Sequence, residues 1–264
     1  MKHGNSDLKG MHSDMYLETK DICKYFGGLK AVDHVNFTIT EGKLKSIIGP
    51  NGAGKTTFFN LLSGFYLPTS GTVLFQGKDI TKKSMNRVSQ IGITKTFQIT
   101  HIFPRLSVFE NIRICAQSRK SSFNFWSSAA HLPDINEKTN EILELVKLTE
   151  VRDRPAAGLS HGEKRYLEIG MTLATDPKIL LLDEPTAGMS PAETCEATDL
   201  IRDVRDKLDL TIVLVEHDMS VVMGISDEVI VLNEGKVLAE GSPQEISDHE
   251  MVQQVYLGET NSVC

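Results

Sequence analysis

Short apolar segments alternate with longer amphipathic segments along most of this chain. Val35, Phe37 and Ile39 stand at alternate positions, the spacing of a strand with one buried face, and residues 44–48 predict a second, buried strand. After a glycine-rich turn, apolar residues recur at the helical spacing i, i+3, i+4 and i+7, namely Phe58, Leu61, Leu62 and Phe65. The pattern therefore predicts paired strands, which begin an antiparallel β layer, followed by a turn and a helix.

The middle of the chain has a helical pattern instead. From residue 104 to residue 146, apolar side chains share one helix face, and a polar stretch at residues 118–122 interrupts the pattern. The residues on this predicted face are Ile135, Ile142, Leu143 and Val146. We expect this segment to form a helical lobe inserted into the rest of the fold.

Strands and helices alternate again in the last third of the chain. The pattern predicts a strand at residues 179–182, a helix at 191–208, a strand at 211–215 and a hairpin at 229–238. This alternation predicts an α/β fold with a mostly parallel sheet that helices cover on both faces. Ligands of such sheets bind beyond the carboxyl ends of the strands, so polar residues at those ends are candidates for a site.

Length and charge narrow the possible functions. The chain has 264 residues, enough for one substantial domain, and its net charge of -7 without a Lys/Arg stripe argues against a nucleic-acid partner. No apolar run is long enough to cross a bilayer. Residues 1–15 are polar and lack a secretory signal, so we expect a mobile tail and a cytoplasmic protein. The four cysteines show no C-x-x-C spacing, and packing is the expected role of Cys23, Cys115 and Cys195.

Two phosphate-site patterns, far apart in the chain, predict one chemistry. The first is Gly49-Pro50-Asn51-Gly52-Ala53-Gly54-Lys55-Thr56-Thr57, which fits G-x-x-x-x-G-K-[ST]. In such a loop the backbone N–H groups surround phosphates, Lys55 reaches the β- and γ-phosphates, and Thr56 reaches the metal ion. The second pattern is the acidic pair Asp183-Glu184 at the end of a predicted strand. Together they predict a nucleoside triphosphatase that requires Mg2+.

A third motif makes the resemblance specific. Leu159-Ser160-His161-Gly162-Glu163 predicts a capping box at a helix start, because Glu163 follows Ser160 by three residues. The same stretch is similar to the L-S-G-G-Q signature of ATP-binding cassette proteins, from which His161 and Glu163 depart. In that family the signature of one subunit faces the phosphate loop of another, so the resemblance implies that Ser160 and Gly162 contact ATP held by a partner cassette.

This resemblance runs from about Tyr16 to Gly258 and implies roles for further residues. It implies a P-loop NTPase fold of the RecA-like type, with a core at residues 16–98 and 177–264 and a helical subdomain at about 99–176. It also implies that Phe26 contacts adenine, with Tyr25 as an alternative, and that His217 contacts the γ-phosphate. Gln98 would reach Mg2+ and the attacking water, Asp183 would hold Mg2+ mostly through water, and Glu184 would polarise the water. Ser190 departs from the aspartate of the family pattern.

Four stretches resemble the importers for branched-chain amino acids within this family: residues 26–32, 96–98, 222–227 and 256–259. The resemblance implies an ATPase on the cytoplasmic face of the membrane, with a second cassette, two permease subunits and an extracytoplasmic binding protein as partners. Import of urea or amides, export, and a soluble role in cofactor assembly remain alternatives. The transported substrate and the identity of the second cassette are not determined by these residues.

Overall fold

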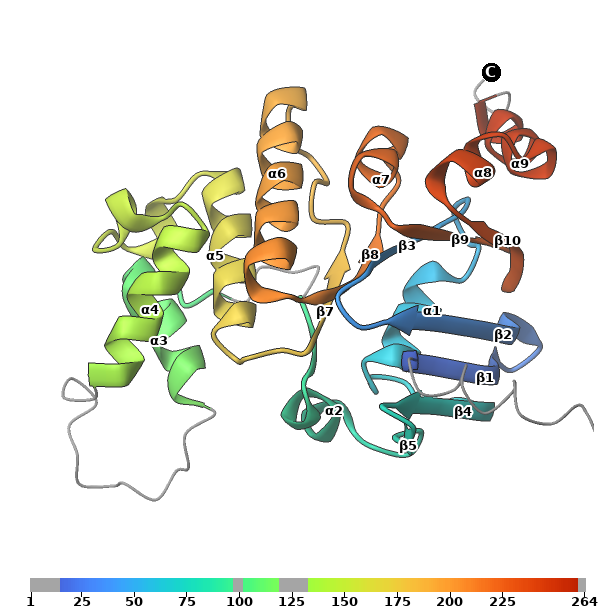
Figure 1. The fold of residues 1–264 in the computed structure, drawn as a ribbon, viewed down its shortest axis with the longest axis horizontal. Helices are drawn as coiled ribbons and strands as arrows, with labels where there is room; N and C mark the ends of the chain where they lie inside the picture. Colours follow the sequence, from blue (N-terminus) through green and yellow to red (C-terminus); the bar gives the residue numbers. More distant parts are fainter. Residues whose placement is uncertain (1–14, 97–101, 119–132, 261–264) are drawn as a thin grey trace, which may run out of the picture. The chain divides into compact units, whose positions relative to one another are not determined.

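The computed structural model describes residues 15–96, 102–118 and 133–260, with side chains up to residue 255 (Figure 1). It divides into two compact units, which are described separately below. Unit 1 comprises residues 1–91 and 211–264, and unit 2 comprises residues 92–210. The predicted tail at residues 1–15 lies outside the described residues except for Met15, where the first strand begins.

An antiparallel sheet forms the first layer of unit 1. Its strands are β1 (Met15–Phe26), β2 (Leu29–Thr40), β4 (Ser70–Phe75) and β5 (Lys78–Asp79), in the order β2-β1-β4-β5. Val35, Phe37 and Ile39 of β2 are buried, as their alternate spacing predicts. The expected antiparallel β layer is thereby confirmed.

A second sheet of unit 1 contains the central strand β3 (Leu44–Ile48). It pairs in parallel with β8 (Thr211–Val215) on one side and with β9 (Glu228–Asn233) on the other. β10 (Lys236–Gly241) then pairs antiparallel with β9, which completes the predicted hairpin. All five residues of β3 and of β8 are buried, as in parallel strands covered on both faces.

One fully buried lysine connects the two layers of unit 1. The Nζ of Lys45 in β3 donates to the Thr38 carbonyl oxygen of β2 at 2.7 Å and lies 2.8 Å from Glu228 Oε2. It also forms an ion pair with Glu240 of β10. A buried ammonium group needs such partners because leaving it unpaired would cost several kcal/mol.

The helix α1 (Lys55–Leu62) follows β3 and packs against β2 and β8, with the Phe58 ring centroid 5.6 Å from that of Phe37. The prediction that Phe65 continues its buried face is wrong, because Phe65 is 56% exposed. The helix ends first: Gly64 has a φ of 69°, and the N–H groups of Gly64 and Phe65 donate to the carbonyls of Leu61 and Asn60. This is a Schellman motif, which stops a helix and satisfies its last carbonyls.

Four more helices of unit 1 lie within the described residues. They are α2 (Met85–Ile91), α7 (Met219–Ile225), α8 (Pro243–Ser247) and α9 (Glu250–Thr260). Residues of α7 to α9 form an apolar cluster with β3 and β9, made by Ile48, Val222, Val229, Val231, Ile246 and Val252. The C-terminal helices are therefore part of the core of unit 1.

Unit 2 contains a group of helices and a short parallel strand pair. The helices α3 (Val108–Gln117), α4 (Pro133–Leu145) and α5 (His161–Leu173) pack on one another, and α6 (Pro191–Leu208) contacts α4 and α5. Two 3-10 turns, Thr149–Val151 and Ala156–Gly158, precede α5, and the strand pair is β6 (Ile93–Lys95) with β7 (Ile179–Asp183). The predicted subdomain at about 99–176 falls within this unit.

The helical face predicted from residues 135 to 146 is buried: Ile135, Ile142, Leu143 and Val146 are each at most 6% exposed. Gly170 of α5 lies at the centre of this packing, because a Cβ there would lie 3.2 Å from Ile112 and 3.3 Å from Val146. Within the described part of the chain, none of the helices combines the length and apolar character that a membrane span requires.

Candidate functional site

The glycine-rich loop between β3 and α1 is closely packed on two of its sides. A Cβ at Gly49 would lie 2.1 Å from the Leu232 carbonyl oxygen, and one at Gly54 would lie 2.2 Å from the Ala31 carbonyl oxygen. Both glycines also have positive φ values, 147° and 100°, which other residues rarely adopt. At Gly52, with a φ of 79°, no atom of the described residues lies within 4 Å of such a Cβ. The loop is therefore fixed at its ends and open at its middle.

Lys55 is buried at the start of α1 and lies along this loop. Its Nζ donates to the carbonyl oxygens of Gly49 and Pro50, at 2.7 and 2.9 Å. The preceding Gly54 is the N-cap, and glycine has no side chain with which to cap the first N–H groups of the helix. Those N–H groups and the positive end of the helix dipole favour an anion at this position. Thr56 follows, with its side chain exposed.

His217 lies at the same sheet edge as the loop. It follows β8, whose Val215 pairs with Ile47 of β3, so the two parallel strands end side by side. The His217 side chain is exposed, and its backbone N–H donates to Glu216 Oε2 at 3.0 Å. Within unit 1 the structure thus brings the loop and this histidine to neighbouring strand ends, where α/β sheets bind ligands.

Of the two aromatic candidates for adenine, Phe26 is the more exposed. Its ring is 43% exposed, lies 5.5 Å from the Tyr66 ring in an edge-to-face arrangement and has Lys24 Nζ 5.1 Å from its centroid. Tyr25 instead donates its hydroxyl to Asp33 Oδ1 at 2.6 Å, and this hydrogen bond raises the pKa of Tyr25 well above its usual range. The Phe26 ring is therefore the one available for stacking.

Asp183 ends β7 in unit 2 and is 1% exposed. Its Oδ2 lies 3.0 Å from Lys95 Nζ, yet neither carboxylate oxygen accepts a hydrogen bond from the described residues. A buried carboxylate with this little coordination fits a divalent cation such as Mg2+, which prefers oxygen ligands. The donor chemistry of the predicted metal residues is thus suitable for Mg2+. Gln98, predicted to join them, lies outside the described residues.

The backbone after Asp183 is held in an unusual conformation. Glu184 has a φ of 47°, a left-handed value that costs a non-glycine residue free energy. Arg165 of α5 donates from one Nη to the carbonyl oxygens of both Asp183 and Glu184, each at 2.7 Å, and from Nε to the Pro185 carbonyl oxygen at 3.2 Å. Arg165 therefore ties α5 to the acidic pair.

Lys95 and Arg165 are the site residues that sequence analysis missed. Neither belongs to a recognised motif, and their partners are distant in sequence. The only available signal was position: Lys95 ends a strand three residues before Gln98, and Arg165 follows Ser160 by five residues. Ion pairs of this kind depend on the register of β6 against β7, in which Lys95 pairs with Leu181.

The helix α5 begins with the predicted capping box. Ser160 Oγ accepts from the Glu163 N–H at 3.2 Å, and Glu163 Oε2 accepts from the Ser160 N–H at 2.7 Å. Gly162 is buried and His161 is exposed. Ser190 forms a second capping box with Glu193 at the start of α6, which gives this departure from the family pattern a structural role. Ser160 and the acidic pair belong to unit 2, whereas Lys55 and His217 belong to unit 1.

Comparison with known proteins identifies the class of this arrangement. Residues 32–187 match the profile of the family described as ABC transporter, and residues 236–260 match that of the branched-chain amino acid ATP-binding cassette transporter. The chain is 40% identical over 250 residues to the high-affinity branched-chain amino acid transport ATP-binding protein BraF of Pseudomonas aeruginosa, covering 92% of this chain and 98% of that protein.

Solved structures give the same result. A crystal structure of an ATP-binding cassette of an ABC transporter in its ADP conformation has a TM-score of 0.83 and 33% identity, covering 92% of this chain and 99% of the other. A dimeric cassette in a post-hydrolysis state, bound to ADP and Pi, has a TM-score of 0.73 and 25% identity, covering 86% and 98%. The chain belongs to the ABC transporter family and is an ATP-binding cassette, the ATPase of such a transporter.

Proposed function

We propose that this protein is the ATP-hydrolysing subunit of an importer for branched-chain amino acids. The observation that carries the proposal is the likeness of nearly the whole chain to a transport protein of that name, together with the C-terminal match at residues 236–260. That C-terminal segment contains β10, α8 and α9, outside the nucleotide motifs. The resemblance is therefore not due to the phosphate loop alone.

The residues described above can divide the work of ATP hydrolysis. When ATP binds, Lys55 exchanges its hydrogen bonds to the loop carbonyls for hydrogen bonds to the β- and γ-phosphate oxygens. The N–H groups at the start of α1 donate to the same phosphates, and the Phe26 ring stacks on adenine. Glu184 orients and polarises the attacking water, and His217 holds the γ-phosphate. A bound Mg2+ would neutralise charge on the β,γ-oxygens, with Thr56, Gln98 and Asp183 as the residues that hold it.

A second cassette completes this site. Ser160 and Gly162 lie at the start of α5. We propose that they contact ATP bound to the other cassette of a dimer, and that the N–H groups at this helix start donate hydrogen bonds to its γ-phosphate. This arrangement makes hydrolysis depend on pairing. Steady-state hydrolysis per protomer should therefore rise with protein concentration until the dimer is saturated, and a constant rate per protomer at all dilutions would contradict it.

The role of Glu184 can be tested by Glu184→Gln, which keeps the size of the side chain and removes its charge. Loss of a general base lowers turnover by roughly 100- to 10,000-fold, while binding of Mg·ATP measured by calorimetry should remain within about threefold of the wild type. Glu150→Gln is the matched control, since Glu150 is an exposed carboxylate of the same unit. Hydrolysis by Glu184→Gln at the control rate would reject the assignment.

The proposed partners are two permease subunits, a second cassette, identical or different, and an extracytoplasmic binding protein that acts through the permeases. The cassette would then lie on the cytoplasmic face of the membrane. The test is reconstitution of the chain in proteoliposomes with permease subunits from the same organism, followed by uptake of labelled leucine, isoleucine or valine. Stimulation of ATP hydrolysis by these amino acids with their binding protein supports the proposal. Stimulation by urea or amides alone, transport in the outward direction, or a complex with soluble proteins only would replace it.

A further inference from the structure

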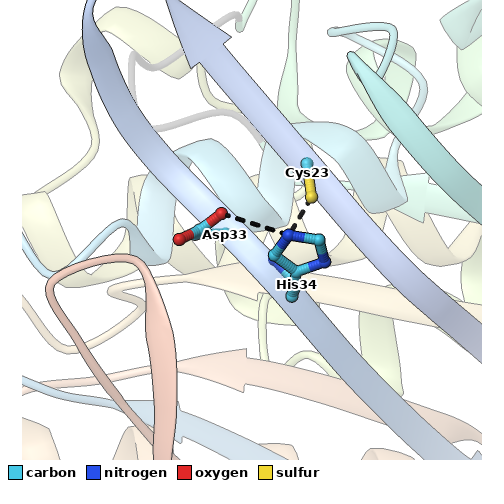
Figure 2. Close-up of side chains that lie close together, drawn as sticks. All are labelled: Cys23, Asp33 and His34. Carbon is cyan, nitrogen blue, oxygen red and sulfur yellow. Dashed lines mark hydrogen bonds and ion pairs between the residues drawn. The ribbon is translucent and has the colours of Figure 1, made fainter.

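Three side chains with metal-ligand chemistry lie together in the antiparallel layer of unit 1, and the nucleotide site uses none of them (Figure 2). Cys23 belongs to β1, and Asp33 and His34 are consecutive residues of the adjacent strand β2. One sulfur, one carboxylate oxygen and one ring nitrogen from these residues all lie within 4.8 Å of one another. A thiolate, an imidazole and a carboxylate are the protein ligands of Zn2+.

The backbone of both strands is distorted where these residues meet. Consecutive side chains of a regular strand point to opposite faces, so Asp33 and His34 could not share a site in a regular β2. His34 instead has a φ of 56°, Asp21 of β1 has a φ of 52°, and the β1–β2 register shifts around Ile22. Left-handed conformations of non-glycine residues persist where the surrounding structure requires them, frequently at functional sites.

The hydrogen bonds around the cluster orient its ligand atoms. Asp21 Oδ1 lies 2.7 Å from His34 Nδ1, which fixes the imidazole and directs Nε2 to the other side, where Asp33 Oδ1 lies 3.7 Å away. Tyr25 donates its hydroxyl to the same Asp33 oxygen at 2.6 Å. A carboxylate on the second nitrogen of a histidine, and a hydrogen bond to a ligating carboxylate, are the outer contacts that metal sites use to orient their ligands.

The thiol of Cys23 supplies the third ligand group and is fully buried. Its sulfur accepts the His34 backbone N–H at 3.2 Å. A thiolate is the form that binds metal ions, and it favours Zn2+ over Mg2+ or Ca2+.

We propose that Cys23, Asp33 and His34 form a binding site for one Zn2+ ion, with water as the fourth ligand. Tetrahedral coordination at about 2.0 to 2.3 Å places ligand atoms roughly 3.3 to 3.8 Å apart, and the 3.7 Å between Asp33 Oδ1 and His34 Nε2 lies in that range. Binding forms the zinc–sulfur bond and releases the thiol proton to water, so a thiolate and a carboxylate balance the charge of the ion. Lys30 and Lys236, 3.5 and 3.6 Å from Asp33 Oδ2, leave Oδ1 as the ligand atom.

The experiment uses the full-length chain, without nucleotide or Mg2+, and Co2+ as a spectroscopic substitute for Zn2+. Because Asp21 raises the pKa of His34, the titration is run at pH 8 to favour the neutral imidazole. We expect a thiolate-to-cobalt absorption band that saturates at one equivalent and disappears when Zn2+ is added. Zn2+ alone should also raise the thermal midpoint, because an ion that binds only the folded chain stabilises it.

Variants identify the ligands. His34→Asn removes the imidazole and keeps a residue that tolerates the left-handed conformation, so it should fold and lose the band; Cys23→Ser should lose it as well. Asp21→Asn should weaken Co2+ binding by about 10- to 100-fold. Cys195→Ser is the control, since Cys195 is exposed on α6 rather than packed as its sequence suggested, and its loss should change nothing. No band in the wild type, or a band that survives in His34→Asn and Cys23→Ser, would overturn the proposal.

Discussion

Ser160 has two possible roles, a helix cap and a contact to ATP, and a charge substitution separates them. Its hydroxyl accepts one hydrogen bond, from Glu163, and its own N–H is bonded in return. Removing that cap by Ser160→Ala costs about 1 kcal/mol of stability. Aspartate caps a helix as well as serine does, and its charge suits the positive end of the helix. Ser160→Asp should therefore unfold in urea at the same midpoint as the wild type.

The same substitution should stop hydrolysis if Ser160 contacts a phosphate. A carboxylate about 4 Å from one phosphate charge, at an effective dielectric constant of about 20, is repelled by about 4 kcal/mol. Since 1.4 kcal/mol is a factor of ten, ATP hydrolysis by the dimer should fall by roughly 1000-fold. Ser160→Ala, which adds no charge, should retain much more activity than Ser160→Asp.

Ser242 provides the matched control, because it caps α8 with the same capping box. Its hydroxyl accepts from the Glu245 N–H at 3.3 Å, and Glu245 Oε2 accepts from its N–H at 2.7 Å. The Ser242 hydroxyl also donates to Glu245 Oε2 at 2.8 Å, a bond that aspartate cannot form, so Ser242→Asp should lower the urea midpoint somewhat and leave the hydrolysis rate of the folded protein unchanged. If Ser160→Asp hydrolyses ATP as fast as Ser242→Asp while both are folded, Ser160 is a cap only and the contact to a partner's ATP is refuted.

Three further predictions, all tested by urea unfolding, concern the glycine-rich loop and the lysines at positions 95 and 45. Gly54→Ala should lower the free energy of unfolding by about 3 kcal/mol, because its Cβ clashes with a backbone carbonyl and its positive φ strains an alanine. Gly52→Ala should lower it by about 1 kcal/mol, from the strain of the positive φ alone. Equal losses in the two variants would contradict this reasoning. Lys95→Met should cost about 3 kcal/mol, because it leaves the 1% exposed Asp183 without its ion pair, and Lys95→Arg should recover most of that loss; a neutral Lys95→Met would refute the structural importance of the pair. Lys45→Met should lower the free energy of unfolding by only about 1 kcal/mol, although the lysine is fully buried. Its two glutamate partners are 46% and 38% exposed, so water can solvate their carboxylates once the lysine is removed. A loss as large as that of Lys95→Met would contradict this reasoning.

Burial produces regular spacing of apolar residues, and this spacing predicted part of the fold; β4 to β6, α2 and α7 to α9 were not predicted. The helix at residues 191–208 and the strand at 211–215 have the predicted bounds, since the helix has a clear apolar period after a definite start signal and the strand is a short continuous apolar run. The error at Phe65 has the opposite cause. Its spacing continues the period of α1, but Gly64 has already ended the helix. The spacing of apolar residues assumes that the helix continues and does not show at which residue it ends.

The contacts of Lys95, Arg165 and Cys23 could not be predicted in this way. Each depends on which residues of two separate segments are aligned, and single-sequence patterns carry little information on register. The proposed zinc ligands Cys23, Asp33 and His34 show this most clearly, because regular alternation places Asp33 and His34 on opposite faces of β2. Only the left-handed backbone at His34 brings them to the same side, and nothing in the spacing of the residues signals that change.

The three capping boxes show what the sequence pattern predicts about the candidate site and what only the assembled structure can add. Ser160, Ser190 and Ser242 are each followed three residues later by glutamate, and all three form the same pair of hydrogen bonds. The sequence pattern therefore predicts the local geometry and cannot distinguish a cap that also contacts ATP from one that does not. That distinction depends on what lies in front of the helix N-terminus in the assembled transporter. Equal caps with unequal effects of aspartate at Ser160 and Ser242 would locate the nucleotide at the first of them.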